Sequence, residues 1–251
     1  IKIAYWLRND SVYIKLATYI QKMVNVTYSF EENFGKTPAF NDSADGISKE
    51  YKALINTCRK YFNLKAEFRG DLEDSGFYII SDQYKKLIFD TGEICPRYLP
   101  AHGHCDALSF ELSINNKPLI VNSGTFRYQR GEWRNYFRST KSHNTVTIEG
   151  QEQSQFWSSF RVADRIKKIR RKSFNYKGIP FYAGAYVSFN ENEHKRFIGV
   201  LDEKIVIVLD FVKAGLNAES YMHFMPEAQL SINNNTVNVV CGHEKIKITA
   251  I

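Results

Sequence analysis

From about residue 71 to the end of the chain, apolar residues recur at every second position in short runs. Turn-forming residues separate the runs, and only residues 151–158 could hold a helix between them. Many short strands with short connections predict a mainly β fold, an antiparallel β-sandwich rather than a parallel sheet. The runs are GFYIIS, YKKLIFD, LSFELSIN, KPLIVN, HNTVTIEG, FYAGAYVSF, KRFIGVL, KIVIVLDFV, ESYMHFM, TVNVV and KIKITAI.

Residues 1–70 follow a different pattern, because apolar residues there recur at helical intervals. Segment 3–24 contains neither Gly nor Pro. A second apolar stripe, with steps of three and four residues, predicts another helix. Its members are Ile47, Tyr51, Leu54, Cys58 and Tyr61. Two or three helices cannot close a core alone. We therefore expect residues 1–70 to pack on a β domain of residues 71–251 and to expose an apolar face that meets further helices.

Both ends of the sequence suggest a longer protein. The chain starts with Ile rather than Met, and it stops inside the strand-like run KIKITAI. We therefore expect a fragment that is truncated at its C-terminus as well. On this interpretation, the absence of a signal peptide says nothing about localisation.

The charge balance favours an anionic partner. The formal net charge is +7, which suits nucleic acid, anionic lipid or an acidic polysaccharide, although a merely soluble basic protein has the same balance. No run approaches the roughly 20 apolar residues of a membrane-spanning helix. The four cysteines are scattered without a C-x-x-C pair, which indicates free thiols.

The segment AHGHCDALSF, residues 101–110, sets two histidines and an aspartate at alternate positions. In an extended segment, His102, His104 and Asp106 would share one face. Such a polar triplet is costly to bury unless it is paired or binds something. The H-x-H spacing is also common in metal sites. From these residues alone, a metal or catalytic site and an exposed loop with chance histidines remain equally good interpretations.

Several motifs occur in a fixed order and together resemble one family. They are HGHCDALSFEL, then VNSGTFRY, then RSTKSHNTVTIEGQEQS. TPAFNDSADG and GFYIISDQYKKLIFDTG precede them, and HKRFIGVLDEKIVIVLDFV and YMHFMP follow. Across about residues 37–226 the sequence resembles the heparinase II/III-like family of polysaccharide lyases. The separate motifs in the correct order make the resemblance specific.

The resemblance implies an (α/α) toroid followed by antiparallel β-sheets, with the active cleft between them. Residues 1–70 would be the last helices of that toroid, and the rest of it would be a missing part of the same chain. The expected function is cleavage of a uronic-acid-containing polysaccharide, such as a glycosaminoglycan or alginate, by β-elimination. The expected parent is bacterial, and periplasmic or secreted, with an acidic polysaccharide rather than nucleic acid as partner. Relatives take a catalytic tyrosine from the toroid, so the isolated chain should be inactive.

The resemblance also implies roles for single residues. A structural zinc ion would be held by His104, Asn122 and His143. Asn122 departs from the family, which has aspartate there, and an amide oxygen is a weaker zinc ligand than a carboxylate. The alternative is a hydrogen-bonded cluster of these three residues without an ion. Apart from the resemblance, the position of Asp106 beside the two histidines favours a role in orienting a histidine through a hydrogen bond over a role as metal ligand.

His102 matches a family position that faces the cleft. Histidine can act as base or hydrogen-bond donor near neutral pH, which suits removal of the C5 proton or neutralisation of the uronate carboxylate. Arg127 and Tyr128 would contact the substrate, because Arg binds carboxylate or sulfate in bidentate fashion and Tyr stacks on a sugar.

Other functional interpretations remain. The chain could be a non-catalytic β-sandwich that binds acidic glycans. A cupin-like metal enzyme fits less well, because Glu111 lies too far along the chain for the usual cupin spacing. The basic run RIKKIRRK, residues 165–172, is either a polyanion-binding stripe or an edge strand protected by lysines.

Overall fold

The computed structural model describes residues 10–44, 46–202 and 204–251. Two helices come first, α2 (Asp10–Glu31) and α3 (Tyr51–Phe62). Residues 3–9 of the first predicted helix lie outside the described residues, and the helix continues beyond the predicted residue 24. α3 ends where Asn63 adopts the left-handed conformation, with its N–H on the Arg59 carbonyl oxygen. No described helix is long and apolar enough to cross a membrane.

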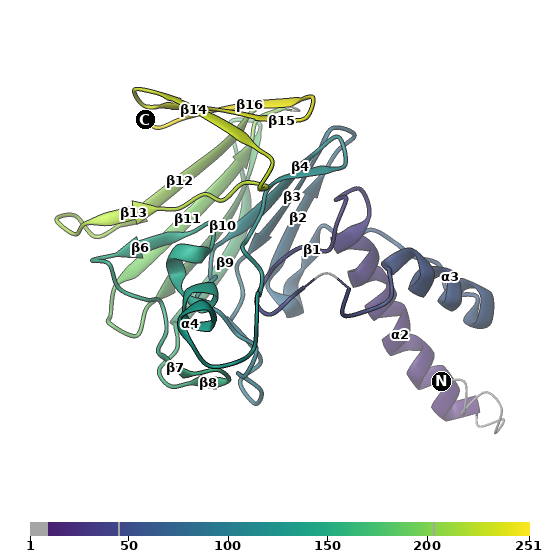
Figure 1. Cartoon of the computed structure of the whole chain (residues 1–251). Coiled ribbons are helices and arrows are strands. Elements are labelled where there is room, and N and C mark those ends of the chain that lie inside the picture. Colours follow the sequence, from purple (N-terminus) through teal and green to yellow (C-terminus); the bar gives the residue numbers. More distant parts are fainter. Residues whose placement is uncertain (1–9, 45, 203) are drawn as a thin grey trace.

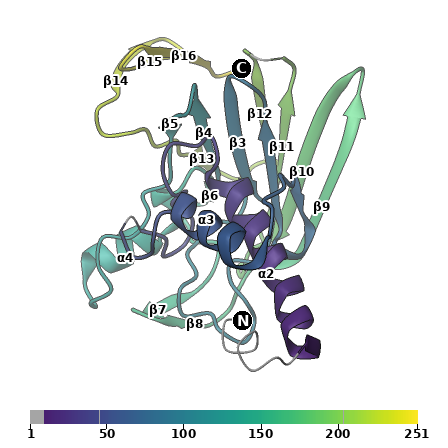
Figure 2. The ribbon, with the colours of Figure 1, turned by 90° about the vertical axis from the view of Figure 1, so that its right-hand side faces the viewer.

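The strands form two main antiparallel sheets. The first has the order β1 (Asp71–Leu72), β2 (Phe77–Ser81), β3 (Lys85–Asp90), β4 (Phe110–Ile114), β5 (Lys117–Ile120). The second has the order β12 (Val206–Val212), β11 (Glu193–Val200), β10 (Ile179–Val187), β9 (Lys167–Tyr176). Figures 1 and 2 show these sheets as layers, with α2 and α3 on the outer side of the first.

Shorter elements complete the chain. Two strand pairs are β6 (Val146–Ile148) with β13 (Ala218–Ser220), and β7 (Phe156–Ser158) with β8 (Arg161–Val162). A three-stranded sheet contains β14 (Gln229–Asn233), β15 (Thr236–Cys241) and β16 (Glu244–Thr249). The remaining helices are η1 (Glu73–Ser75), α4 (Glu132–Arg138) and η2 (Thr140–Ser142).

The main core lies between the two large sheets. Leu87 and Phe89 of β3 join Tyr186 of β10 and Ile198 of β11 in one buried cluster. Each fully buried side chain of this size stabilises the fold by about 1.5–3 kcal/mol. The predicted antiparallel β-sandwich, preceded by a helical segment, is therefore confirmed.

Helix α2 and the loop that follows it cover the other face of the first sheet. Ile79 and Ile88 alternate with the core-facing residues of β2 and β3. They pack against Phe30 of α2 and against Phe34 and Phe40 in the loop after it. β3 is consequently buried along its whole length. The helical segment also exposes apolar side chains, as expected, with Met23 65% exposed. Ile14, Tyr19, Leu54 and Tyr61 are also exposed.

The structure corrects several local expectations. The helix α4 was not predicted, and neither was β14. Residues 151–158 form a β-bridge and strand β7 rather than a helix. The basic run of residues 165–172 overlaps β9, which lies at the edge of its sheet. This agrees with the interpretation of the run as an edge strand protected by lysines.

One glycine in the second sheet positions a distant loop. Gly184 lies in β10, and a Cβ atom there would lie 2.2 Å from Cδ2 of Leu108. Leu108 therefore occupies the space that a side chain on the sheet would fill. It is 2% exposed and belongs to the main core. This contact fixes the end of the segment that carries the two neighbouring histidines.

Lys86 links β3 to the helices. It is 1% exposed, and its Nζ donates a 2.5 Å hydrogen bond to the carbonyl oxygen of Glu32, just beyond α2. Burial lowers the pKa of Lys86 to about 8, and the acidic neighbours Glu31 and Glu32 offset only part of this effect.

We expect Lys86→Met to remove a pH dependence of stability. The ordinary lysine pKa of 10.5 lies above the folded value of about 8, so the unfolded chain binds more protons between these values. As pH rises through this window, the native chain should gain up to about 3 kcal/mol relative to Lys86→Met. Urea unfolding of both proteins at a series of pH values measures this. The exposed control Lys245→Met should differ from the native chain by the same unfolding free energy at every pH. If the difference between the native chain and Lys86→Met were equally independent of pH, the expectation would be wrong.

Candidate functional site

The carboxylate of Asp42 joins four separate segments. It lies in the loop between α2 and α3, and its side chain is only 5% exposed. Oδ1 accepts hydrogen bonds from His104 Nε2 at 2.8 Å, from Thr125 Oγ1 at 2.9 Å and from Arg134 Nη1. Oδ2 accepts from His102 Nδ1 at 2.9 Å and from Arg134 Nη2 at 2.8 Å. Both histidines of the H-x-H motif therefore bind the same carboxylate.

Asp42 remains ionised despite its burial. Burial alone would raise its pKa, but hydrogen bonds from His104 and Arg134 outweigh this and hold the pKa well below the usual range. Arg134 is 1% exposed and is the buried counterion. Arg134 also donates to Thr125 Oγ1 and to the carbonyl oxygen of Ser159, so α4 is tied to the neighbouring turns.

His102 is the exposed member of this cluster. Its Nδ1 faces Asp42, which can only accept, so Nδ1 carries the proton. The side chain is 59% exposed, and the rings of Phe160 and Tyr128 lie 5.7 and 6.3 Å away, centroid to centroid. Nε2 has no hydrogen-bond partner within the part of the chain that the structure describes. In the neutral ring this nitrogen has a lone pair that can take a proton.

His104 and His143 lie together in the interior. Both are fully buried, and their ring centroids are 5.3 Å apart. Burial lowers the pKa of His104, so the ring is neutral, with its proton on the Nε2 that donates to Asp42. Burial, reinforced by His104, also lowers the pKa of His143 well below its usual range. His104 Nδ1 and both ring nitrogens of His143 lack partners within residues 10–44, 46–202 and 204–251.

Asn122 lies beyond the end of β5 and is almost wholly buried. Its Oδ1 accepts a 3.1 Å hydrogen bond from the backbone N–H of Asn144, and its Nδ2 donates to Ser109 Oγ at 3.3 Å. The amide oxygen therefore already has one partner, and it carries no charge. A carbonyl oxygen has a second lone pair, so it can still serve as a weak ligand.

These residues fit a metal ion in most respects. A metal-binding histidine usually donates its other ring N–H to a carboxylate, as His104 does to Asp42. Its unprotonated Nδ1 and the ring nitrogens of His143 are of the type that zinc binds. The third donor would be the neutral Asn122. No group of three or more His, Cys, Asp or Glu in the described chain is arranged to hold a metal.

The two expected substrate contacts have different surroundings. The ring of Tyr128 lies beside His102 and 5.5 Å from the guanidinium of Arg134. The guanidinium of Arg127 stacks 4.9 Å from the ring centroid of Phe126 and is exposed. Arg127 has no carboxylate partner among the described residues.

Asp106 differs from its expected role. Its Oδ2 accepts a 2.8 Å hydrogen bond from the backbone N–H of Asn41, and no described hydrogen bond joins Asp106 to a histidine. Asn41 Oδ1 in turn accepts from the backbone N–H of His104. Asp106 thus fixes the loop that carries Asp42, and Asp42 orients the histidines. The segment is a loop with turns, so the strand alternation behind the expectation does not apply.

Sequence reasoning missed Asp42 and Arg134. Asp42 lies within the motif TPAFNDSADG, which was noted only for its resemblance. Arg138 is buried too, and it donates to the carbonyl oxygens of Gly103, Ser158 and Ser159. A buried arginine needs a carboxylate or carbonyl partner, but the sequence around Arg134 and Arg138 does not show which residue supplies it.

Asp42→Ala should lower the free energy of unfolding by about 3–5 kcal/mol, because it leaves the buried Arg134 without a counterion. Chemical denaturation measures the loss. The matched control is Asp74→Ala, which removes an exposed carboxylate and should change stability by less than about 0.5 kcal/mol. Equal effects of the two substitutions would show that the cluster does not hold the loops together.

A family model described as "Heparinase II/III-like, C-terminal" matches residues 67–249. The heparin-sulfate lyase of Bacteroides stercoris is 23% identical over 179 residues, which cover 68% of this chain and 25% of that protein. The chain therefore spans about a quarter of the length of this curated relative.

Solved structures agree in fold. Heparan sulfate lyase HepC from Pedobacter heparinus aligns with a TM-score of 0.67 at 18% identity, over 85% of this chain and 36% of that one. A heparinase III aligns with a TM-score of 0.67 at 20% identity, over 87% of this chain and 36% of that one. At such identities the likeness establishes the fold alone.

Proposed function

The chain belongs to the heparinase II/III-like family, and we propose that it forms the β domain of a polysaccharide lyase that cleaves a uronic-acid-containing polymer by β-elimination. The observation that carries this proposal is the environment of His102. Its ring is exposed, one nitrogen is bound to a buried carboxylate, and the other faces outward without a described partner. Such an arrangement presents a single nitrogen in a fixed orientation to a ligand.

The reaction assigns a clear role to that nitrogen. A base removes the proton at C5 of the uronate, the electron pair forms the C4–C5 double bond, and O4 leaves with a proton. His102 Nε2 would either take the C5 proton or, when protonated, donate a hydrogen bond to the uronate carboxylate. Asp42 holds the ring so that Nδ1 cannot turn toward the substrate.

We propose that the other catalytic group comes from a toroid domain of the same longer protein. The resemblance implies a tyrosine there that protonates O4, and the relatives are much longer than this chain. Tyr128, beside His102, would contact the sugar, and Arg127 would bind its carboxylate or sulfate. The isolated chain should therefore be inactive.

The proposed substrate is a sulfated glycosaminoglycan rather than alginate. The names of the relatives, which are lyases of heparin and heparan sulfate, support this choice. The net charge of +7 also suits a polyanion. We place the parent protein in a bacterium, in the periplasm or outside the cell, on the family resemblance.

His102→Ala in the full-length protein should lower the elimination rate about 10²–10⁴-fold, because it removes a positioned proton-transfer group. Ultraviolet absorbance of the new double bond measures the rate on a panel of uronate polymers. The control His243→Ala removes a histidine from the turn before β16 and should keep the native rate.

Two other outcomes are informative. A native rate in His102→Ala with an unchanged unfolding transition would remove His102 from the mechanism. A complete absence of elimination by the native full-length protein, on every acidic polymer, would favour the non-catalytic glycan-binding module instead.

We propose in addition that His104, His143 and Asn122 hold a structural zinc ion. The three unpartnered nitrogens of the two buried histidines and the carboxylate behind His104 support this proposal. Zinc would supply a cross-link between the H-x-H loop, the end of β5 and the segment before β6. It has no assigned part in the elimination.

Protein purified without chelator should contain about one zinc ion per chain, measured by elemental analysis, and Asn122→Asp should bind it more tightly because a carboxylate replaces an amide. His143→Ala should lose the ion and the thermal stability it provides, whereas His243→Ala should keep both. Less than about a tenth of an equivalent, in both the native chain and Asn122→Asp, would reject the zinc site.

A further inference from the structure

The hairpin of β7 and β8 brings a residue that the proposed mechanism does not use to the exposed ring of His102. Ser159 and Phe160 form the turn of this hairpin. The ring centroids of Phe160 and His102 lie 5.7 Å apart, and the two ring planes meet at 69°. Such edge-to-face contacts are favourable and depend on the relative orientation of the rings. Phe160 therefore restricts the orientation of the histidine ring.

Tyr128 extends this contact to a cluster of three rings. Its ring centroid lies 5.8 Å from that of Phe160 and 6.3 Å from that of His102. Each ring of the cluster thus has the other two as neighbours. Tyr128 is 40% exposed and Phe160 is 41% exposed, so the cluster lies at the surface rather than in the core.

The same rings cover the buried ion pair. The guanidinium of Arg134 lies 5.5 Å from the ring centroid of Tyr128 and 5.4 Å from that of Phe160. Both rings are partly exposed, yet Arg134 itself is almost inaccessible to water. The ion pair with Asp42 is stronger for being shielded in this way, because attraction between charges increases as water is excluded.

Two buried arginines hold the turn of the hairpin. Arg134 Nε donates to the carbonyl oxygen of Ser159 at 3.0 Å. Arg138 Nη1 donates to the carbonyl oxygens of Ser158 and Ser159 at 2.6 and 2.9 Å. All of these acceptors are backbone atoms. The position of the turn is therefore set independently of the side chain of Phe160.

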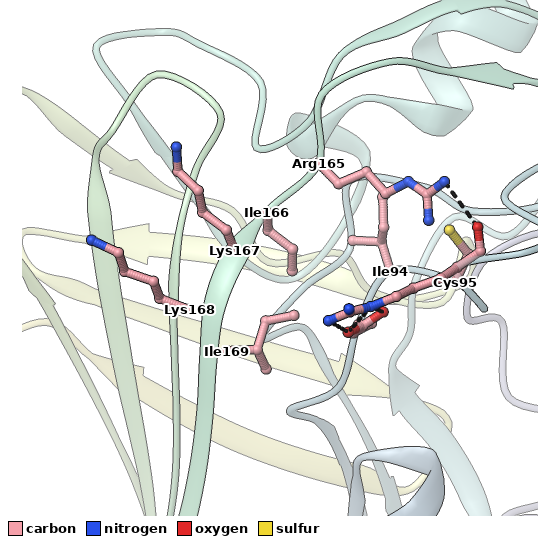
Figure 3. A pocket seen from close by; sticks show the side chains of 9 residues that line it. Ile94, Cys95, Arg165, Ile166, Lys167, Lys168 and Ile169 are labelled. Atoms are coloured by element: carbon pink, nitrogen blue, oxygen red, sulfur yellow. Dashed lines mark hydrogen bonds and ion pairs between the residues drawn. The ribbon is translucent and has the colours of Figure 1, made fainter.

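The base of the hairpin is fixed as well. Just after β8, Arg165 Nη2 donates a hydrogen bond to the carbonyl oxygen of Arg97 at 3.2 Å, drawn as a dashed line in Figure 3. The backbone N–H of Ile166 donates to Ser154 Oγ at 3.0 Å, and the Ile166 side chain belongs to the same buried cluster as Ile94. A hairpin held at both ends can present one ring to the histidine in a constant position.

Trp157 of the same hairpin is the natural comparison for Phe160. It is 63% exposed, and its ring lies 5.6 Å from the guanidinium of Arg161. No described ring contact joins Trp157 to His102. The hairpin thus carries two exposed aromatic side chains, of which Phe160 is in contact with the histidine.

We propose that Phe160 is a positioning residue for His102. Its ring holds the histidine ring against Asp42 with Nε2 outward, and it shields the ion pair that fixes Nδ1. The proposal rests on the proposed function, since it takes Nε2 of His102 as the atom that acts on the polymer. It adds a functional part for the β7–β8 hairpin, which supplies no proton-transfer group.

The first test is the tautomer of His102 in the 251-residue chain, observed in a long-range proton–nitrogen correlation spectrum of the neutral ring. The signal is assigned by its loss in His102→Ala. The native chain should show one tautomer, with the proton on Nδ1, whereas Phe160→Ala should show a mixture of both. Without the aromatic contact the ring can rotate, and water competes for Asp42. Phe160→Ala keeps the backbone carbonyls that the arginines bind, so the fold should persist.

Two further variants serve as controls. Phe160→Tyr keeps the ring and should retain the single tautomer. Trp157→Ala removes an exposed aromatic ring from the same hairpin and should retain it too. A single Nδ1–H tautomer in Phe160→Ala would overturn the proposal. So would an equal mixture of tautomers in Trp157→Ala and Phe160→Ala, because the effect would then come from a loosened hairpin.

The second test is the elimination rate of the full-length protein. Phe160→Ala should lower kcat about tenfold, because a small misplacement of a reacting group is costly, and should change KM less than about twofold. Phe160→Tyr should restore kcat. An unchanged kcat beside a mixture of tautomers would overturn the role in the reaction. If the native full-length protein eliminates no polymer, the proposed function fails, and the tautomer spectrum alone decides whether Phe160 orients His102.

Discussion

The buried ion pair between Asp42 and Arg134 is the interaction on which the rest of the candidate site depends. Removing both charges from water is expensive, so the pair is stable only while donors from several segments complete its hydrogen bonds. Those donors come from the H-x-H loop, the turn at Thr125 and the helix α4. None of these segments has a core of its own. The carboxylate therefore orders them together, and it sets the proton positions of both His102 and His104.

The sandwich supplies the rigid frame for these loops. β3 is covered on both faces, by the second sheet and by α2 with the loop after it, so the strands that flank the H-x-H loop cannot move independently. Glu111 of β4 accepts hydrogen bonds from the backbone of Ala39 and Asn122, which ties the loop that carries Asp42 and the end of β5 to the same sheet. The site is thus formed by irregular backbone, but its position is set by regular structure.

The sandwich could be predicted from the sequence because one face of most strands is buried and the other is more exposed. Apolar residues therefore recur at every second position along these strands. β14 was missed because its residues are exposed throughout, so no burial pattern marks it. α4 was missed because seven residues are too few for a helical period to be recognised. The motif order identified His102, His104, Asn122 and His143, yet the pairing with Asp42 spans some 60 residues of chain and leaves no local trace. The alternation rule that linked Asp106 to the histidines failed because the motif forms a turn, in which Leu108 has a positive φ of 59°.

The contact between Gly184 and Leu108 has a consequence for how variation in this chain is interpreted. The position of the histidine loop depends partly on the lack of a Cβ atom at Gly184, which leaves room for Leu108 against the second sheet. A substitution at Gly184 would look like a change in the hydrophobic core, yet it would displace Leu108 and, four and six residues earlier, both histidines. The tolerance of this strand to substitution therefore reflects the geometry required at the surface as much as the packing of the interior.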